Sequence, residues 1–139
     1  MYTYRIIKLV LLIIILPVGL FAQEETVKVE VLSKTSSSWD GAEIEAYPSG
    51  KPEITISRIT MPVGFELPVH KHTTPLGGMI LEGELTVTKE NGESKVFKAG
   101  DPIVEVMNTW HAGKNTGEVP TVLIAFYIGE QDTPLSINQ

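Results

Sequence analysis

Short segments that alternate apolar and polar residues, or that are rich in β-branched residues, recur along the chain from residue 26 onward. Such segments predict β-strands, because successive side chains on a strand point to opposite faces. The predicted strands are residues 26–32, 43–46, 53–61, 79–88, 94–97, 103–106 and 121–128. No stretch repeats apolar residues at helical spacing over more than about ten positions, so little helix is expected.

Turn-forming residues separate these segments and favour one fold class. Asn91-Gly92 predicts a tight hairpin between residues 81–88 and 94–97, because a two-residue type I′ turn needs a positive φ at both positions. Gly83 interrupts a predicted strand, which indicates a bend or the close approach of another backbone. Many short strands at close spacing favour an all-β barrel or sandwich over an α/β fold.

Residues 1–22 are expected to be a secretory signal peptide. Arg5 and Lys8 precede an uncharged run, residues 9–22, that is shorter than the roughly 20 apolar residues of a bilayer span. Residues 23–139 would then form a single exported domain, periplasmic or secreted, with no stable membrane association after cleavage. The alternative is a permanent anchor, which Leu20 favours because a smaller residue is usual three positions before the cut.

Composition narrows the chemistry that this chain can perform. It has 11 Lys and Arg against 17 Asp and Glu, a formal charge of −6, so it has no cationic excess for binding nucleic acid or an anionic membrane. It has no cysteine, which excludes disulfides, thiolate nucleophiles, iron–sulfur clusters and cysteine-rich zinc sites. Any catalytic or metal-binding chemistry must therefore use histidines, carboxylates and hydroxyl groups.

The chain has three histidines, and two of them are separated by a single residue. His70 and His72 would share one face of a strand, with Lys71 on the other face. Two imidazoles on one face form a chelating pair for a transition metal, to which His111 could add a third nitrogen. The alternative is that His70 and His72 are half-exposed strand residues that bind nothing.

The segments around the histidines resemble the two sequence motifs of the cupin family. The first motif covers about 64–83 and contains His70-Lys71-His72, and the second covers about 100–115 and contains His111. The resemblance implies a cupin-type double-stranded β-helix, which is a jelly-roll barrel, with all three histidines at the family's metal-ligand positions. It also implies a small-molecule ligand or substrate and, as in other small exported cupins, a homodimer that pairs through sheet edges.

Two positions depart from the cupin motifs. The family's metal-binding glutamate would fall at Leu76 or Gly77, and neither residue can bind a metal through its side chain. The Pro-x-Gly turn of the second motif is replaced by Val106-Met107-Asn108, in which Asn108 can adopt the left-handed conformation that glycine would supply. The usual carboxylate ligand is therefore missing, whereas the altered turn is expected to spare the fold.

Glu105 is the candidate replacement for that carboxylate. It shares strand parity with Ile103 and is flanked by large apolar residues, where a charge is costly without a partner. The cupin resemblance directs this parity toward the barrel interior, near His111. Glu105 is expected to serve as a fourth metal ligand or catalytic base, or as an acceptor that fixes an imidazole tautomer. The alternative is an edge-strand glutamate that faces water.

Two further residues are expected to have structural roles. Trp39 lies in the amino-terminal arm that precedes the motifs, and it is expected to anchor this arm to the barrel or to another subunit. Asn115 is expected to stabilise the backbone that follows His111.

Three interpretations of the function stay open. The first is a metal-dependent enzyme of dioxygenase, isomerase or lyase type that acts on a small molecule, with His70, His72 and His111 as metal ligands and Glu105 as ligand or base. The second is a cupin that binds a metal or small ligand without turnover, and the third is a structural barrel with relic histidines. With Glu105 as a ligand the set suits Fe, Mn, Ni or Zn, and without it Zn or Cu.

Overall fold

The computed structural model describes residues 27–139, so the predicted signal peptide, residues 1–22, lies outside the described residues. The chain divides into two compact units, Met1–Glu30 and Val31–Gln139. Residues 27–30 of the first unit are exposed and have no regular secondary structure. From residue 27 to residue 139, no helix is long and apolar enough to cross a membrane. All the strands described below belong to the second unit.

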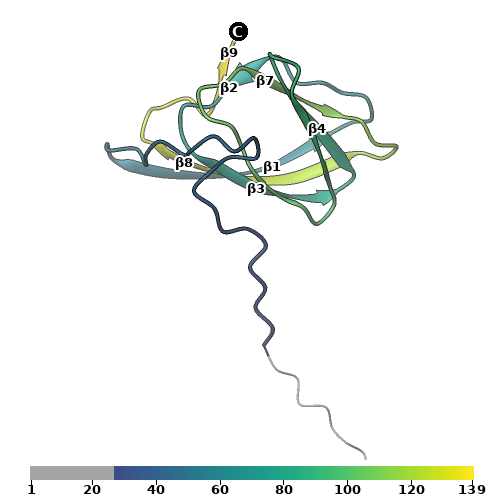
Figure 1. The fold of residues 1–139 in the computed structure, drawn as a ribbon, viewed down its shortest axis with the longest axis horizontal. Coiled ribbons are helices and arrows are strands. Elements are labelled where there is room, and N and C mark those ends of the chain that lie inside the picture. Colours follow the sequence, from purple (N-terminus) through teal and green to yellow (C-terminus); the bar gives the residue numbers. More distant parts are fainter. Residues whose placement is uncertain (1–26) are drawn as a thin grey trace, which may run out of the picture. The chain divides into compact units, whose positions relative to one another are not determined.

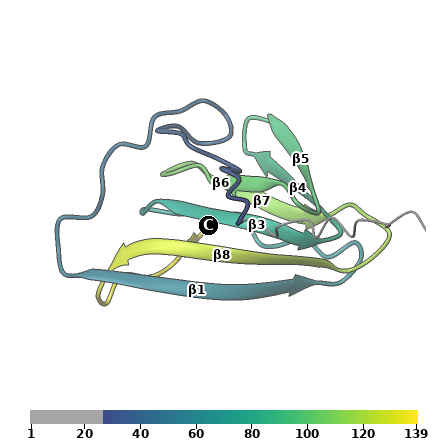
Figure 2. The same ribbon diagram turned by 90° about the horizontal axis from the view of Figure 1, so that it is seen from below.

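Nine strands within the described residues form two antiparallel sheets (Figure 1, Figure 2). The strand order is β1-β8-β3-β6 in one sheet and β5-β4-β7-β2-β9 in the other. The prediction of an all-β fold is confirmed, because none of the described residues is helical. The strands are β1 (Pro52–Met61), β2 (His70–Lys71), β3 (Leu76–Glu82), β4 (Glu84–Lys89), β5 (Ser94–Lys98), β6 (Pro102–Val104), β7 (His111–Asn115), β8 (Thr121–Glu130) and β9 (Ile137–Asn138).

Two of the predicted strands are not formed. Residues 27–32 have no strand, and residues 43–46 contribute only an isolated bridge between Ser37 and Glu43. Val27, Val29 and Val31 alternate with charged residues, but they stay 71% or more exposed. Alternation alone does not make a strand, because the backbone must also find a partner for its hydrogen bonds. Four of the other five predicted segments lie in β1, β3 with β4, β5 and β8. The fifth, 103–106, is a strand only in part, because β6 ends at Val104 and Glu105 and Val106 follow it.

Gly83 divides the predicted strand 79–88 and moves the chain from one sheet to the other. β3 ends at Glu82 in the first sheet, and β4 begins at Glu84 in the second. Gly83 has a φ of 73°, and a Cβ at this position would lie 2.6 Å from the Pro120 carbonyl oxygen. The predicted bend is confirmed, and it forms the corner at which the chain passes from one sheet to the other.

The hairpin between β4 and β5 has a different turn from the one predicted. Its loop contains three residues, because the Lys89 amide donates to the Glu93 carbonyl and the Gly92 amide donates to the Lys89 carbonyl. Gly92 has a φ of 88°, but Asn91 is not in the left-handed region. Instead the Asn91 side chain accepts a hydrogen bond from the Glu93 amide at 3.0 Å. The prediction of a two-residue type I′ turn was therefore wrong, because the side chain of Asn91 stabilises the longer loop.

The hydrophobic core takes residues from both sheets, and the amino-terminal arm packs against it. The buried cluster contains Met61, Ile80, Leu85, Val87, Phe97, Ile103 and Leu123. The indole of Trp39 packs on this cluster and meets the Phe97 ring edge-on, with 6.5 Å between centroids. The Trp39 amide also donates to the Val104 carbonyl at 2.9 Å. Trp39 is thus the anchor of the arm on its own barrel, as predicted.

Replacing Gly83 with Ala should lower the free energy of unfolding by about 3 kcal/mol, measured by urea denaturation. A left-handed conformation costs a residue with a Cβ about 1–2 kcal/mol, and here the new atom would also lie 2.6 Å from the Pro120 oxygen. Gly92→Ala is the matched control, because Gly92 also has a positive φ but nothing lies within 4 Å of its Cβ position. Equal losses in the two variants would show that the contact with Pro120 contributes nothing.

Candidate metal centre

Three imidazoles meet between the two sheets. His70 lies in β2, His111 is the first residue of β7, and these two residues are register partners in the β2–β7 pair. The ring centroid of His70 lies 4.5 Å from that of His111 and 5.0 Å from that of His72, and 5.2 Å separates His72 from His111. One ring nitrogen from each histidine lies within 4.8 Å of the other two. The prediction that the three side chains converge is confirmed.

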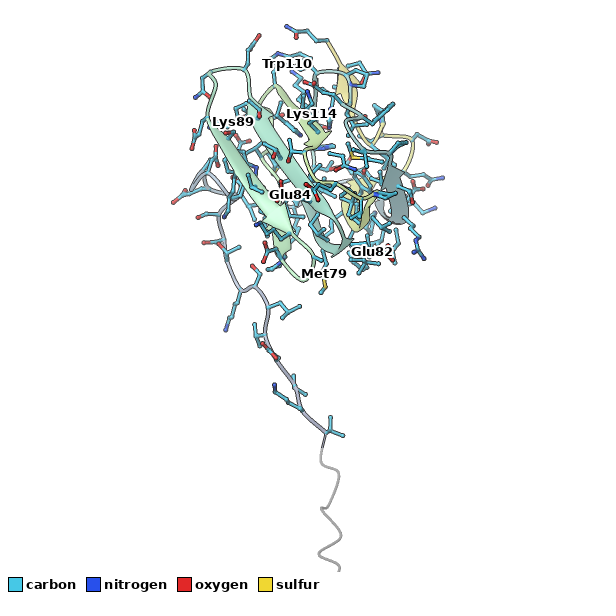
Figure 3. The ribbon with its side chains drawn as sticks, turned by 90° about the vertical axis from the view of Figure 1, so that its right-hand side faces the viewer. Met79, Glu82, Glu84, Lys89, Trp110 and Lys114 are labelled. Atoms are coloured by element: carbon cyan, nitrogen blue, oxygen red, sulfur yellow. The ribbon has the colours of Figure 1, made fainter. Side chains whose placement is uncertain are left out.

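Local backbone pairing directs these side chains inward. His72 follows β2 and forms an isolated bridge with Met107, and its carbonyl accepts a hydrogen bond from the Asn108 amide at 2.8 Å. Asn108 has a φ of 52°, the left-handed conformation predicted for it. Lys71 points away from the two histidines, and its ammonium lies 4.8 Å from the centroid of the Trp110 ring. Figure 3 labels Trp110, and at the opposite end of the barrel it labels Met79 and Glu82 of β3.

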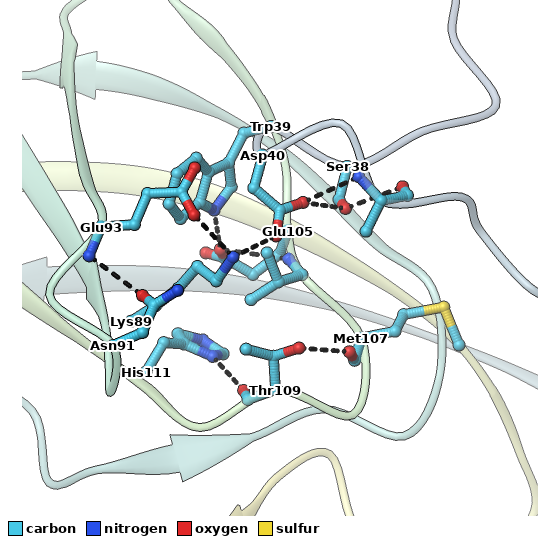
Figure 4. A network of polar contacts seen from close by, with 12 residues as sticks. Ser38, Trp39, Asp40, Lys89, Asn91, Glu93, Glu105, Met107, Thr109 and His111 are labelled. Atoms are coloured by element: carbon cyan, nitrogen blue, oxygen red, sulfur yellow. Dashed lines mark hydrogen bonds and ion pairs between the residues drawn. The ribbon is translucent and has the colours of Figure 1, made fainter.

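Each imidazole is oriented by a backbone carbonyl. The Nδ1 atoms of His70, His72 and His111 lie 2.8 Å from carbonyl oxygens of Pro68, Leu135 and Thr109 respectively. A carbonyl oxygen only accepts hydrogen bonds, so each Nδ1 must carry the proton and donate it. The three Nε2 atoms are then left with free lone pairs. Figure 4 shows the bond from His111 to Thr109.

Burial keeps these rings uncharged. His72 is 4% exposed and His111 is 2% exposed. Burial lowers the pKa of His70 and His111, although the carbonyl acceptors of their Nδ1 protons act in the opposite direction. Burial lowers the pKa of His72 to about 4. The three rings are therefore neutral near pH 7, which is the state in which an imidazole binds a metal.

The Nε2 atom of His111 is buried and has no hydrogen-bond partner among the described residues. A buried polar atom without a partner costs about 1–3 kcal/mol, so such atoms are rare unless they bind something. This lone pair lies in a cluster of three nitrogens that lie within 4.8 Å of one another. Three imidazole nitrogens are suitable ligands for a divalent transition metal, such as Zn²⁺, Cu²⁺, Fe²⁺, Ni²⁺ or Mn²⁺.

The histidines open into a cavity of about 60 Å³. Leu76, one of the two positions where the cupin glutamate would fall, is 8% exposed and contributes a purely aliphatic side chain to the cavity wall. Gly77, the other position, follows it in β3 and has no side chain to offer. Neither residue supplies the missing carboxylate.

Glu105 lines the same cavity and is 8% exposed, so the alternative of an edge glutamate facing water is wrong. Its Oε1 atom accepts a hydrogen bond from the Trp39 indole Nε1 at 2.9 Å and a longer one from the Val106 amide at 3.3 Å. Burial raises the pKa of Glu105, and these two hydrogen bonds oppose the rise. The expected role as acceptor for an imidazole is also wrong, because backbone carbonyls accept all three Nδ1 protons.

An ion pair next to Trp39 fixes the arm over Glu105 (Figure 4). The Lys89 ammonium lies 2.6 Å from the Asp40 carboxylate and 2.8 Å from the Glu93 carboxylate. Burial would raise the pKa of Asp40, but hydrogen bonds from Lys89, the Ala42 amide and Ser38 lower it to about 2. The charge on Asp40 thus holds the corner of the arm that presents the indole to Glu105.

Tyr127 is a cavity residue that the sequence analysis missed. It lies on β8, is 8% exposed, and its ring centroid is 5.8 Å from that of His72. Burial raises the pKa of its phenol. Strand parity could have found it, because Thr121, Leu123, Ala125 and Tyr127 are all buried. Asn115 has the role predicted for it, since its amide donates to the carbonyls of Met61 and Val119 at 3.0 and 2.9 Å.

Comparison with known proteins gives a family and a fold. A family model described as a cupin domain matches residues 57–127, which contain all three histidines and Glu105. No curated protein matches this sequence. The cupin-type all-β fold is confirmed by this match and by the solved structures that resemble the chain.

Three solved structures illustrate the likeness. A DMSP lyase from Ruegeria pomeroyi is 22% identical, with a TM-score of 0.53, over 62% of this chain and 43% of that chain. A cupin-like protein from Thermotoga maritima is 13% identical, with a TM-score of 0.55, over 62% of this chain and 64% of that one. An oxalate oxidase in complex with the substrate analogue glycolate is 20% identical, with a TM-score of 0.53, over 80% and 59% respectively. Each match spans less than two thirds of the similar chain and shows the fold alone.

The metal-free protein should lose stability as the pH falls from 6.5 toward 4. The unfolded chain binds a proton at His72 near pH 6.5, whereas the folded chain, with a pKa of about 4, does not. Unfolding therefore becomes easier across this window, by about 2–3 kcal/mol for this residue, and no further loss from His72 occurs below it. Denaturant unfolding of the protein and of His72→Gln at each pH measures the effect. Parallel pH curves for the two proteins would contradict it.

Trp39→Phe should destabilise the protein by about 2 kcal/mol, because it retains an aromatic ring but leaves the buried Glu105 without the indole donor. Glu105→Met provides the second arm of a double-mutant cycle, since it removes the acceptor and keeps the volume. In the Glu105→Met background the cost of Trp39→Phe should fall by about 1–2 kcal/mol. Additive losses in urea denaturation would mean that the two side chains do not interact.

Proposed function

The chain belongs to the cupin family, and from this premise we propose that it is an exported metalloprotein that acts on a small molecule. His70, His72 and His111 are the ligands of one divalent transition metal in this proposal. The supporting observation is the buried Nε2 atom of His111, which has no partner among the described residues and lies among two other imidazole nitrogens. A scaffold with relic histidines would carry the cost of this unsatisfied buried atom, beside two other imidazole nitrogens within 4.8 Å, with nothing to offset it.

A metal held in this way supplies a Lewis acid that polarises a carbonyl or hydroxyl group of a bound molecule. The chain's own contribution is to leave room for that molecule. Three histidines occupy fewer positions than the four to six that these metals adopt, so the cavity side of the site is free for a ligand. Ile59, Leu76 and Leu123 form part of the wall on that side and exclude water.

Glu105 is proposed as the proton acceptor of the site. Its Oε1 atom is engaged by Trp39, and no hydrogen bond to its Oε2 atom is found among the described residues. Burial raises its pKa, which makes a carboxylate a stronger base toward a substrate proton. Proton transfer of this kind suits an isomerase or a lyase. A dioxygenase would need a redox-active metal such as Fe²⁺ in addition to the same three histidines.

A second candidate function is metal or small-ligand binding without turnover. It is favoured by Leu76 and Gly77, which replace the carboxylate that cupin metal sites usually carry. The two functions differ in whether Glu105 moves a proton, so they separate when a metal-loaded protein is compared with its Glu105→Gln variant.

The proposal includes export and pairing. Export is supported by Arg5 and Lys8 before the uncharged run 9–22. Pairing as a homodimer through sheet edges is supported by β1, which is an edge strand with Ile54 and Ile56 67% and 62% exposed.

Titration of the metal-free protein with Zn²⁺ or Co²⁺, followed by calorimetry and elemental analysis, should give one ion per chain. His72→Ala and His111→Ala should each weaken binding by about two orders of magnitude, because each removes one of three nitrogens. Lys71→Ala is the matched control: it lies between two proposed ligands but points away, so its affinity should be unchanged. Glu105→Gln should keep equimolar metal and lose any turnover.

The absence of bound metal at equimolar supply would contradict the proposal and leave only the scaffold. A loss of affinity in Glu105→Gln as large as in the histidine variants would instead make Glu105 a fourth ligand.

A further inference from the structure

The cavity beside the histidines restricts the charge of the molecule it can take, an inference that rests on the proposed function. Of the described residues that line it, none is Lys or Arg. Its polar side chains are the three imidazoles, the carboxylate of Glu105 and the hydroxyl of Tyr127. Proteins usually bind the carboxylates of small molecules with Arg or Lys, through charge-assisted hydrogen bonds. This wall therefore has no anchor for a charged group beyond the metal itself.

The remaining wall is aliphatic and comes from both sheets. It contains Ile59, Met61, Leu67, Leu76, Leu85 and Leu123. A hydrocarbon group placed against these side chains is stabilised by about 25 cal/mol per Å² of buried surface. A carboxylate in the same place would lose its hydration and gain no hydrogen bond in return.

Lys89, the register partner of His111 in the β4–β7 pair, is already engaged in ion pairs. The Lys89 ammonium lies 2.6 Å from the carboxylate of Asp40, which follows Trp39 on the amino-terminal arm, and 2.8 Å from the carboxylate of Glu93. Its side chain is 13% exposed, so it has little freedom to turn toward the cavity. A ligand that recruited Lys89 would have to break both ion pairs.

The net charge of the metal, Glu105 and a bound ligand also disfavours a ligand with two negative charges. A dication beside an ionised Glu105 leaves one positive charge, which a singly charged head group neutralises. A second carboxylate on the ligand would leave a net negative charge in a buried region, where it is poorly screened. The volume of about 60 Å³ is also far below the roughly 300–1,000 Å³ of pockets for larger ligands.

We propose that the site takes a small molecule with one metal-binding oxygen head of at most one negative charge and an uncharged aliphatic remainder, and that it rejects dicarboxylates. Short 2-hydroxy acids, 2-keto acids and hydroxy ketones with alkyl tails have this chemistry.

The test compares 2-hydroxybutyrate with malate on the Co²⁺-loaded protein. The two molecules share the hydroxy-acid head and differ by a terminal methyl group in one and a carboxylate in the other. Changes in the visible absorption of Co²⁺ report binding of each. 2-Hydroxybutyrate should bind the protein at least about tenfold more tightly than malate. Free Co²⁺ in buffer should give the opposite order, because the second carboxylate adds attraction to a dication.

Two variants test the physical cause. Leu67→Lys adds a cation to the wall at a partly buried position and should raise malate affinity about tenfold or more relative to 2-hydroxybutyrate, whereas Leu67→Gln should not. Glu105→Gln removes the resident negative charge and should raise malate affinity without a comparable change for 2-hydroxybutyrate. Circular dichroism checks that each variant is folded.

Equal binding of the two ligands, or tighter binding of malate by the unmodified protein, would overturn this inference while leaving the metal centre intact. A protein that binds no Co²⁺ would overturn the metal centre itself, and the two failures are therefore distinct.

Discussion

The three hydrogen bonds between imidazole Nδ1 atoms and backbone carbonyls are the constraint on which the site depends. They come from three separate parts of the backbone, at Pro68, Thr109 and Leu135, each at 2.8 Å from its histidine. Because carbonyls cannot donate, they fix all three tautomers and leave the Nε2 lone pairs free. The barrel thus holds three neutral nitrogen donors close together, and the buried Nε2 atom of His111 has no hydrogen-bond partner among the described residues.

The amino-terminal arm positions the carboxylate of Glu105, as the backbone carbonyls position the imidazoles. In the function we propose, Glu105, which directly follows β6, takes the place of an acidic residue that cupins carry elsewhere. The indole of Trp39 holds one of its oxygens, and the arm that carries Trp39 is itself tied down by Asp40 and Lys89. The carboxylate is therefore positioned by a segment outside the two cupin motifs. Meanwhile Leu76 makes the former carboxylate position part of an apolar wall.

These two changes together alter what the cavity can recognise. A metal site with neutral nitrogens, one restrained carboxylate and aliphatic walls has most of its attraction concentrated at the metal. In the selectivity that we propose, the wall disfavours a second charge on a ligand, because that charge would find no partner there. The two similar enzymes named above share the fold at low identity, and a shared fold does not fix the chemistry of a site.

The sequence by itself determined the strand periodicity and the bend at Gly83, because these follow from side-chain alternation and turn residues. The convergence of His70, His72 and His111 and the inward position of Glu105 were predicted from the resemblance to the cupin motifs. Only the tertiary structure decided the partners of these residues. The carbonyl of Leu135 lies 63 positions from His72, and Trp39 lies 66 positions from Glu105. Such contacts depend on how distant segments close the barrel, and the same is true of segments 27–32 and 43–46, whose alternation found no partner strand.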